Sequence, residues 1–194
     1  MPNSIVIVQG APRRNGNTRA ITACTIASAR ECGSQVDEID AVALAFKKPG
    51  CIGCQQCQES EAFLCAFDDE LGKKVATLPQ YDVIVFATPL YWWSYPAQLK
   101  MFIDRMYSLT KLTDPENHRS LLTGKSLALL ATAGGPYEEN LELLERQLKN
   151  PAEMLGCRFY SCVYPNTSSE KGSIVNDSKA LEKARAFGKT LAYA

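Results

Sequence analysis

Hydrophobic and polar positions follow two alternating patterns along this chain. Short strand-like runs occupy residues 4–9, 35–39, 83–88, 126–132 and 158–164. Longer segments with helical spacing follow them, at residues 17–32, 68–78, 96–107, 137–155 and 177–192. Strands that alternate with helices are typical of βα units, in which the strands run parallel and the helices cover the sheet. The pattern therefore predicts five such units in one domain that spans residues 1–194.

Five units are too few for an eight-stranded barrel, so we expect an open, doubly wound α/β sheet. The expected architecture is a flavodoxin-like three-layer sandwich with a five-stranded parallel sheet in the order 2-1-3-4-5. In this order, ligands bind at the carboxyl ends of the first and third strands, where the winding reverses. The loops that follow those two strands should therefore carry the binding residues.

Composition narrows the functional classes. The 21 Lys and Arg residues balance 21 Asp and Glu residues, so net charge does not favour nucleic acid or an anionic membrane as a partner. The chain shows no secretory leader pattern, and its apolar runs are too short to cross a bilayer. We expect a cytoplasmic protein. The one histidine, His118, lies in a polar stretch, which argues against a Ser-His-Asp hydrolase and a multi-histidine metal site.

The loop after the first strand, residues 10–18, has the features of a phosphate site. It leads into a helix, whose free backbone N–H groups and dipole favour an anion. Arg13 and Arg14 add positive charge, and Asn17 or Thr18 can cap the helix or bond the phosphate. The glycine spacing matches neither the dinucleotide fingerprint nor the NTPase loop. A monophosphate such as that of FMN remains, although an ordinary βα turn would have a similar sequence.

The loops after the third and fourth predicted strands have unusual compositions. Residues 88–96 contain four large aromatic side chains where turns are usually polar, which suits a flat ligand such as an isoalloxazine ring. The alternative is that these rings pack on helices or at a dimer contact. The pair Gly134–Gly135 would let the backbone approach a ligand edge. A plain strand-to-helix turn is the alternative at that loop.

These motifs together resemble the NADPH-dependent FMN reductase group of the flavodoxin-like superfamily, and especially its iron–sulfur flavoprotein branch. The resemblance is carried by the phosphate loop, by the Cys51-x-x-Cys54-x-x-Cys57 run with Cys65 and Asp68–Asp69, and by residues 88–92, 97–100 and 104–105. It implies bound FMN, NAD(P)H as co-substrate, and a homodimer or homotetramer with the flavin near a subunit contact. It also implies the cofactor-binding residues Arg13, Asn15, Asn17, Thr18, Pro89, Leu90, Tyr91, Trp92, Trp93, Thr132, Gly134 and Gly135.

The cysteine run has three interpretations. Three thiols spaced by two residues, with a fourth further along, can hold a [4Fe–4S] cluster. The spacing to Cys65 differs from that of bacterial ferredoxins. Four thiolates could instead bind zinc, although two separated C-x-x-C pairs are more usual there. The thiols could also stay free of metal and only shape the pocket, so the metal ligands remain open.

We therefore expect an FMN-dependent oxidoreductase that takes hydride from NAD(P)H and passes electrons to a quinone, a nitro compound, a flavin or a similar small acceptor. No general acid or base is needed for hydride transfer, because the flavin carries the chemistry. One alternative is an electron carrier with a [4Fe–4S] cluster on Cys51, Cys54, Cys57 and Cys65. The other is a non-catalytic module whose cysteine loop recognises a partner.

Overall fold

The computed structural model describes residues 1–113 and 118–194. Five parallel strands form one sheet in the order β2-β1-β3-β6-β7. The two remaining strands, β4 and β5, pair with each other outside this sheet, so the order equals the expected 2-1-3-4-5. The prediction of a flavodoxin-like sheet is confirmed. The strands of the sheet are β1 (Ile5–Gln9), β2 (Val36–Asp40), β3 (Val83–Pro89), β6 (Ser126–Thr132) and β7 (Arg158–Tyr164).

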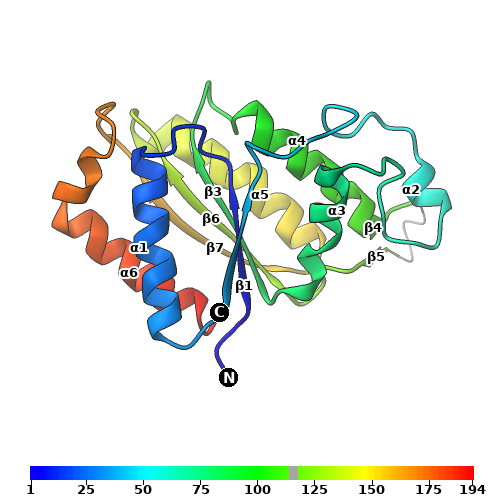
Figure 1. Ribbon diagram of the computed structural model, residues 1–194, viewed down its shortest axis with the longest axis horizontal. Helices are drawn as coiled ribbons and strands as arrows, with labels where there is room; N and C mark the ends of the chain where they lie inside the picture. Colours follow the sequence, from blue (N-terminus) through cyan, green and yellow to red (C-terminus); the bar gives the residue numbers. More distant parts are fainter. Residues whose placement is uncertain (114–117) are drawn as a thin grey trace.

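Helices cover both faces of the sheet, and each face has its own core (Figure 1). One face carries α1 (Asn17–Glu31) and α6 (Ser178–Leu191), which pack beside each other. The other face carries α3 (Glu70–Ala76), α4 (Ala97–Arg105) and α5 (Glu142–Met154). The strands β3 and β6 are buried along nearly their whole length because helices flank them on both sides.

The helix after Pro96 presents an apolar face to the core. Leu99 and Phe102 are fully buried on α4, and Met106 follows them into the core. The helix itself ends at Arg105, and a 3₁₀ turn, Met106–Leu109, continues it. Lys100 and Asp104 form an ion pair on the same helix, with Lys100 Nζ 2.6 Å from Asp104 Oδ1. This amphipathic pattern fixes which side of α4 faces the sheet.

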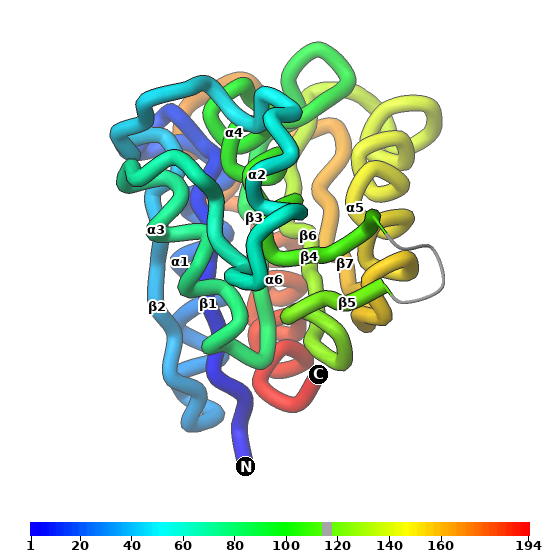
Figure 2. The backbone as a smooth tube through the Cα atoms, turned by 90° about the vertical axis from the view of Figure 1, so that its right-hand side faces the viewer, coloured from blue at the N-terminus to red at the C-terminus, as the bar shows by residue number. Residues whose placement is uncertain are grey.

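Two short elements lie where the sequence predicts only loops. The four-residue helix α2 (Gln56–Glu59) lies within the cysteine run, and β4 (Thr110–Lys111) pairs antiparallel with β5 (Arg119–Ser120). Figure 1 shows this hairpin near α2, away from the five-stranded sheet, and Figure 2 shows it in front of β6 and β7 when the molecule is viewed from that side. No described helix is long and apolar enough to cross a membrane.

Candidate functional site

The phosphate-type loop lies between β1 and α1 and is left open to an anion. Gly16 is the N-cap residue of α1, and no side chain forms a capping hydrogen bond there. No acidic residue lies in the first turn of the helix. Gly16 N–H donates to the Arg13 carbonyl oxygen over 2.9 Å, which closes the loop on itself. The positive end of a 15-residue helix therefore faces outward without a competing carboxylate.

A cleft of about 170 Å³ opens directly above this helix terminus. Four loops form its walls: those after β1, β3 and β6, and a fourth that follows β7. The cleft is smaller than the roughly 300–1,000 Å³ typical of sites that enclose a small molecule. Its lining residues are Ala11, Pro12, Arg13, Gly16, Asn17, Thr18, Pro89, Leu90, Tyr91, Thr132, Ala133, Gly134, Thr167, Ser168, Ser169, Glu170 and Lys171.

Two buried threonines bind the first loop to the third across the floor of the cleft. The hydroxyls of Thr18 and Thr132 lie 2.7 Å apart, and both side chains are buried. Thr18 is on the first turn of α1 and Thr132 is the last residue of β6. A buried hydroxyl needs a partner, so this pair fixes the distance between the helix terminus and the strand.

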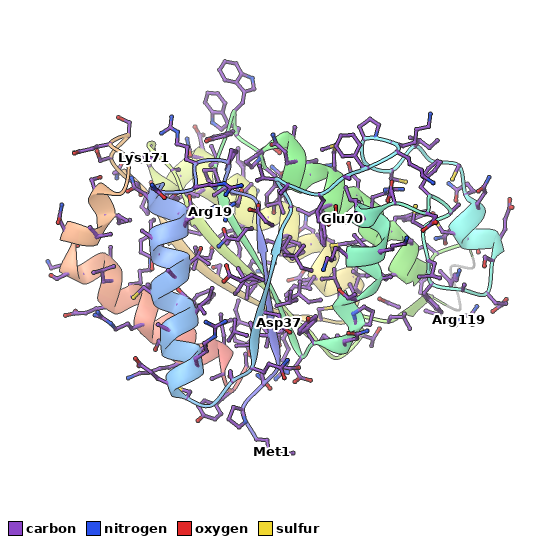
Figure 3. All side chains as sticks on the ribbon, in the orientation of Figure 1. Met1, Arg19, Asp37, Glu70, Arg119 and Lys171 are labelled. Atoms are coloured by element: carbon purple, nitrogen blue, oxygen red, sulfur yellow. The ribbon has the colours of Figure 1, made fainter. Side chains whose placement is uncertain are left out.

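Arg19 holds the phosphate loop from the side of β2. Its Nε donates to the Ala11 carbonyl over 3.0 Å, and its Nη2 is 2.9 Å from Asp40 Oδ1. Figure 3 places Arg19 and Lys171 at the same end of the molecule, where α1 begins. Arg19 is therefore turned to the backbone of the loop, whereas Arg13 and Lys171 bring positive charge to the cleft itself.

The side chain of Asn17 connects the first loop to the fourth. Its Nδ2 donates to the carbonyls of Ser168 and Glu170, at 2.8 and 3.0 Å, and its Oδ1 accepts from Ile174 N–H at 3.2 Å. Asn17 lines the cleft, but its amide is already occupied by these three bonds. Residues 167–171 are the part of the site that sequence reasoning missed, because a polar loop without glycine repeats carries no motif.

The aromatic loop after β3 is a tight turn with an unusual backbone. Tyr91 and Ser94 exchange backbone hydrogen bonds of 2.9 and 3.0 Å, and the two residues between them are Trp92 and Trp93. Both tryptophans have left-handed φ values, 49° and 58°, which bulky residues rarely adopt. Trp92 is 89% exposed and Trp93 is 51% exposed, with their rings 5.6 Å apart edge to face. Gln147 on α5 supports the turn by donating to the Trp93 carbonyl.

In the glycine loop after β6, Gly135 packs closely on Asn140, whereas Gly134 has free space around it. A Cβ on Gly135 would lie 2.7 Å from Asn140 Nδ2, whereas the nearest atom to a Cβ on Gly134 would be 3.8 Å away. Tyr137 follows, and its hydroxyl donates to Glu145 over 2.6 Å, which raises the pKa of Tyr137 to about 12. The turn at Glu139, with a φ of 53°, delays the start of α5 to Glu142. The expected helix over residues 137–155 thus begins five residues late.

The structure gathers eight of the twelve predicted cofactor residues around the cleft. These are Arg13, Asn17, Thr18, Pro89, Leu90, Tyr91, Thr132 and Gly134. Asn15, Trp92, Trp93 and Gly135 lie outside its lining. The two tryptophans follow Tyr91 directly at the rim, and Asn15 lies within the phosphate loop.

A second cavity contains the three cysteines of the run and Cys65. Cys51, Cys54, Cys57 and Cys65 all line it, together with Arg105 and Phe67. All four thiols are free. Among residues 1–113 and 118–194, no three His, Cys, Asp or Glu side chains converge closely enough to hold a single metal ion. The cavity thus brings the thiols to one place without forming a one-ion site.

Buried polar side chains fix residues 57–62, which we call the cysteine segment, on β4 and on the residue that follows it. Lys111 is 5% exposed, and its Nζ donates to the backbone carbonyls of Cys57, Ser60 and Ala62. Gln58 donates to the Thr110 carbonyl at 2.9 Å and accepts from Leu112 N–H at 2.9 Å. These buried hydrogen bonds fix the cysteine segment in one position on β4.

An open parallel α/β sheet with a cleft at the point where its winding reverses defines this chain as a doubly wound α/β protein. The family model described as flavodoxin-like fold matches residues 3–188, so the chain belongs to this family.

Similarity to individual proteins extends over most of the chain. An iron-sulfur flavoprotein from Methanocaldococcus jannaschii is 28% identical over 192 residues, 97% of this chain and 95% of the relative. An FMN-dependent NADH:quinone oxidoreductase from Pseudoalteromonas atlantica is 27% identical over 155 residues, 71% of this chain and 72% of the relative. The crystal structure of an FMN-dependent NADH-azoreductase from Bacillus anthracis in complex with FMN superimposes with a TM-score of 0.72 at 15% identity. That match covers 98% of this chain and 100% of the other.

Proposed function

We propose that this protein is an FMN-dependent oxidoreductase that takes a hydride from NAD(P)H and reduces a small acceptor such as a quinone, a nitro compound or a flavin. The observation that carries the proposal is the uncapped terminus of α1 beneath a cleft at the winding reversal of the sheet. The names of the quinone oxidoreductase relative and the azoreductase support it. When bound, FMN accepts the hydride and passes the two electrons to the acceptor.

The cleft fits the phosphate and sugar arm of FMN. Backbone N–H groups at the start of α1 and the guanidinium of Arg13 would hold the phosphate, and Ser168, Ser169 and Lys171 add donors from the opposite wall. A cleft of about 170 Å³ is too small for the whole cofactor. The ring would therefore be held at the rim by Pro89, Leu90 and Tyr91, together with Trp92, Trp93, Gly134 and Gly135. Asn15, which lies within the same loop, would help to hold the phosphate.

We propose that the protein assembles as a homodimer or homotetramer in which a second copy covers the exposed indole of Trp92 and the flavin ring beside it. Trp92 supports this because an indole that is 89% exposed on a strained turn gains from being covered. Analytical ultracentrifugation of the FMN-loaded protein tests it, and a monomer at micromolar concentration would contradict it. A cytoplasmic location belongs to the same proposal, since all eight cysteines are free, as in a reducing compartment.

The experiment for the main proposal is an anaerobic titration. The purified protein is reconstituted with FMN, its visible spectrum is recorded, and NADPH or NADH is added. We expect bound flavin absorbance that is bleached by the nicotinamide and restored by a quinone. A protein that retains no flavin after reconstitution, or whose flavin is not bleached, would contradict the proposal.

A second candidate function, an electron carrier with a [4Fe–4S] cluster, is favoured by the cysteine cavity. Each thiolate of such a cluster binds a different iron, so the ligands spread around it rather than converge on one point. Four thiols around one cavity without a convergent triplet therefore fit a cluster better than one zinc ion. Cys51, Cys54, Cys57 and Cys65 would hold it. Iron and sulfide assays after anaerobic purification test this, and a Cys51→Ala variant with unchanged iron content would argue against it.

A further inference from the structure

Arg105 is the most deeply buried charged residue at the cysteine cavity. Its side chain is 1% exposed and lies at the last turn of α4. A guanidinium is costly to bury unless its donors are used. Nη2 pairs with Asp69, Nη1 donates to Cys65 Sγ over 2.7 Å, and Nε has no hydrogen-bond partner among the described residues.

Asp69 is only partly available to neutralise this guanidinium. Its oxygens also accept from the backbone N–H groups of Lys47 and Gly72, at 2.9 and 2.8 Å, where Asp69 caps α3. The Phe67 ring lies 5.1 Å from Arg105 Cζ and closes that side of the cavity. Of the Arg105 donors that Asp69 does not use, Nη1 therefore points at the sulfur of Cys65.

We propose that Arg105 is a positioning residue for a thiolate-bound iron–sulfur cluster in this cavity: it holds the Cys65 sulfur in place and raises the reduction potential of the cluster with its positive charge. The inference rests on the second candidate function. Hydrogen bonds to ligand sulfurs and nearby charge are the main influences of a protein on cluster potential. A buried cation favours the reduced state because that state carries one more negative charge.

The competing role for Arg105 is purely structural, as a tie between α3 and α4 through Asp69. The two roles differ in the sign of their effects. If the pair only holds the helices together, loss of either partner should loosen the cavity in the same way. If charge at the cluster matters, loss of Arg105 should lower the potential and loss of the Asp69 charge should raise it.

The experiment compares four variants with the wild type after anaerobic reconstitution with ferrous iron, sulfide and FMN. The variants are Arg105→Gln, Arg105→Lys, Asp69→Asn and Arg119→Gln. Arg119 is the matched control. It is a mostly exposed cation that pairs with Glu61 of the cysteine segment, and its described contacts include no sulfur. Iron, sulfide and FMN contents, the rate of iron loss to a chelator, and the midpoint potential by EPR-monitored titration are measured.

We expect Arg105→Gln to lower the midpoint potential and to lose iron about 10- to 100-fold faster, the usual effect of removing a residue that supports a metal ligand. Asp69→Asn should raise the midpoint potential. Arg105→Lys keeps the positive charge, so its midpoint potential should stay close to that of the wild type, and Arg119→Gln should match the wild type. Shifts of the same sign in Arg105→Gln and Asp69→Asn, or none, would overturn the inference. If Arg105→Gln does not fold, an Asp69→Asn potential that fails to rise overturns it.

The same measurements separate this inference from the two functional proposals. A wild type that binds FMN but takes up neither iron nor sulfide refutes both the cluster and the role of Arg105, and leaves the reductase proposal standing. A wild type that holds a cluster but no FMN refutes the reductase proposal alone.

Discussion

Replacing Gly10 by alanine tests how closely the phosphate loop packs on α4. A Cβ at this position would lie 2.6 Å from Leu99 Cδ2 and 2.7 Å from Leu99 Cβ. The Cδ2 atom could rotate away, but Cβ is fixed to the helix backbone, so the loop and α4 must separate. Overpacking of this kind costs about 1–3 kcal/mol. For a chain of this size, that lowers Tm by roughly 2–12 °C.

The assay is thermal unfolding of the protein without FMN, followed by a fluorescence titration with FMN. The Gly10→Ala variant should unfold earlier and bind FMN more weakly, because the displaced loop carries the phosphate donors. Gly134→Ala is the matched control: its Cβ would meet only the Thr167 carbonyl oxygen, at 3.8 Å, so its stability should change by less than about 0.5 kcal/mol.

A double-mutant cycle identifies the cause of the loss. Leu99→Ala removes the Cγ and Cδ atoms that crowd the new methyl group but leaves Cβ, so relief should be partial. We expect a coupling energy of about 0.5–3 kcal/mol between the two substitutions. A Gly10→Ala variant with wild-type Tm and wild-type FMN affinity, or strictly additive losses in the double variant, would refute the reasoning.

Three further results are expected. Arg13→Ala should weaken FMN binding by about 1.5–3 kcal/mol, measured by titration, and leave riboflavin binding unchanged; equal losses for both ligands would contradict a phosphate contact. Thr18→Val should reduce the free energy of unfolding by about 1–3 kcal/mol in urea, because the buried Thr132 hydroxyl loses its partner. Hydrogen bonds from Ser4 N–H and Ser4 Oγ lower the pKa of Asp82, so its stabilising effect is present above the unfolded pKa of about 3.9 and is lost as pH falls below it. The stability difference between wild type and Asp82→Asn should therefore shrink in acid, and a constant difference would refute this.

The positions of the strands could be predicted because each strand carries its signal locally. The sequence boundaries of β6 and β7 match the structure residue for residue, since both are short apolar or β-rich runs between clear turns. The end of α1 was also predicted to within one residue. Periodicity therefore determined the sheet, and the winding rule then located the cleft.

The fourth wall of the cleft could not be predicted, because its residues reach the site through long-range contacts. Asn17 contacts Ser168, Glu170 and Ile174, which lie more than 150 residues away in the sequence. The burial of Lys111 could not be predicted for the same reason. A lysine in a polar stretch indicates a solvated loop, yet the ammonium of Lys111 donates to three backbone carbonyls of the cysteine segment. Only the tertiary structure shows that these polar groups are buried.

The central claim, that the terminus of α1 holds the phosphate of a flavin mononucleotide, is tested most directly by comparing FMN with riboflavin. The two ligands share the ring and the ribityl chain and differ only in the phosphate. One lost charged hydrogen bond costs about 1.5–3 kcal/mol, so riboflavin should bind at least about tenfold more weakly, with the difference reduced in Arg13→Ala. Equal dissociation constants for FMN and riboflavin in the wild-type protein would contradict the account.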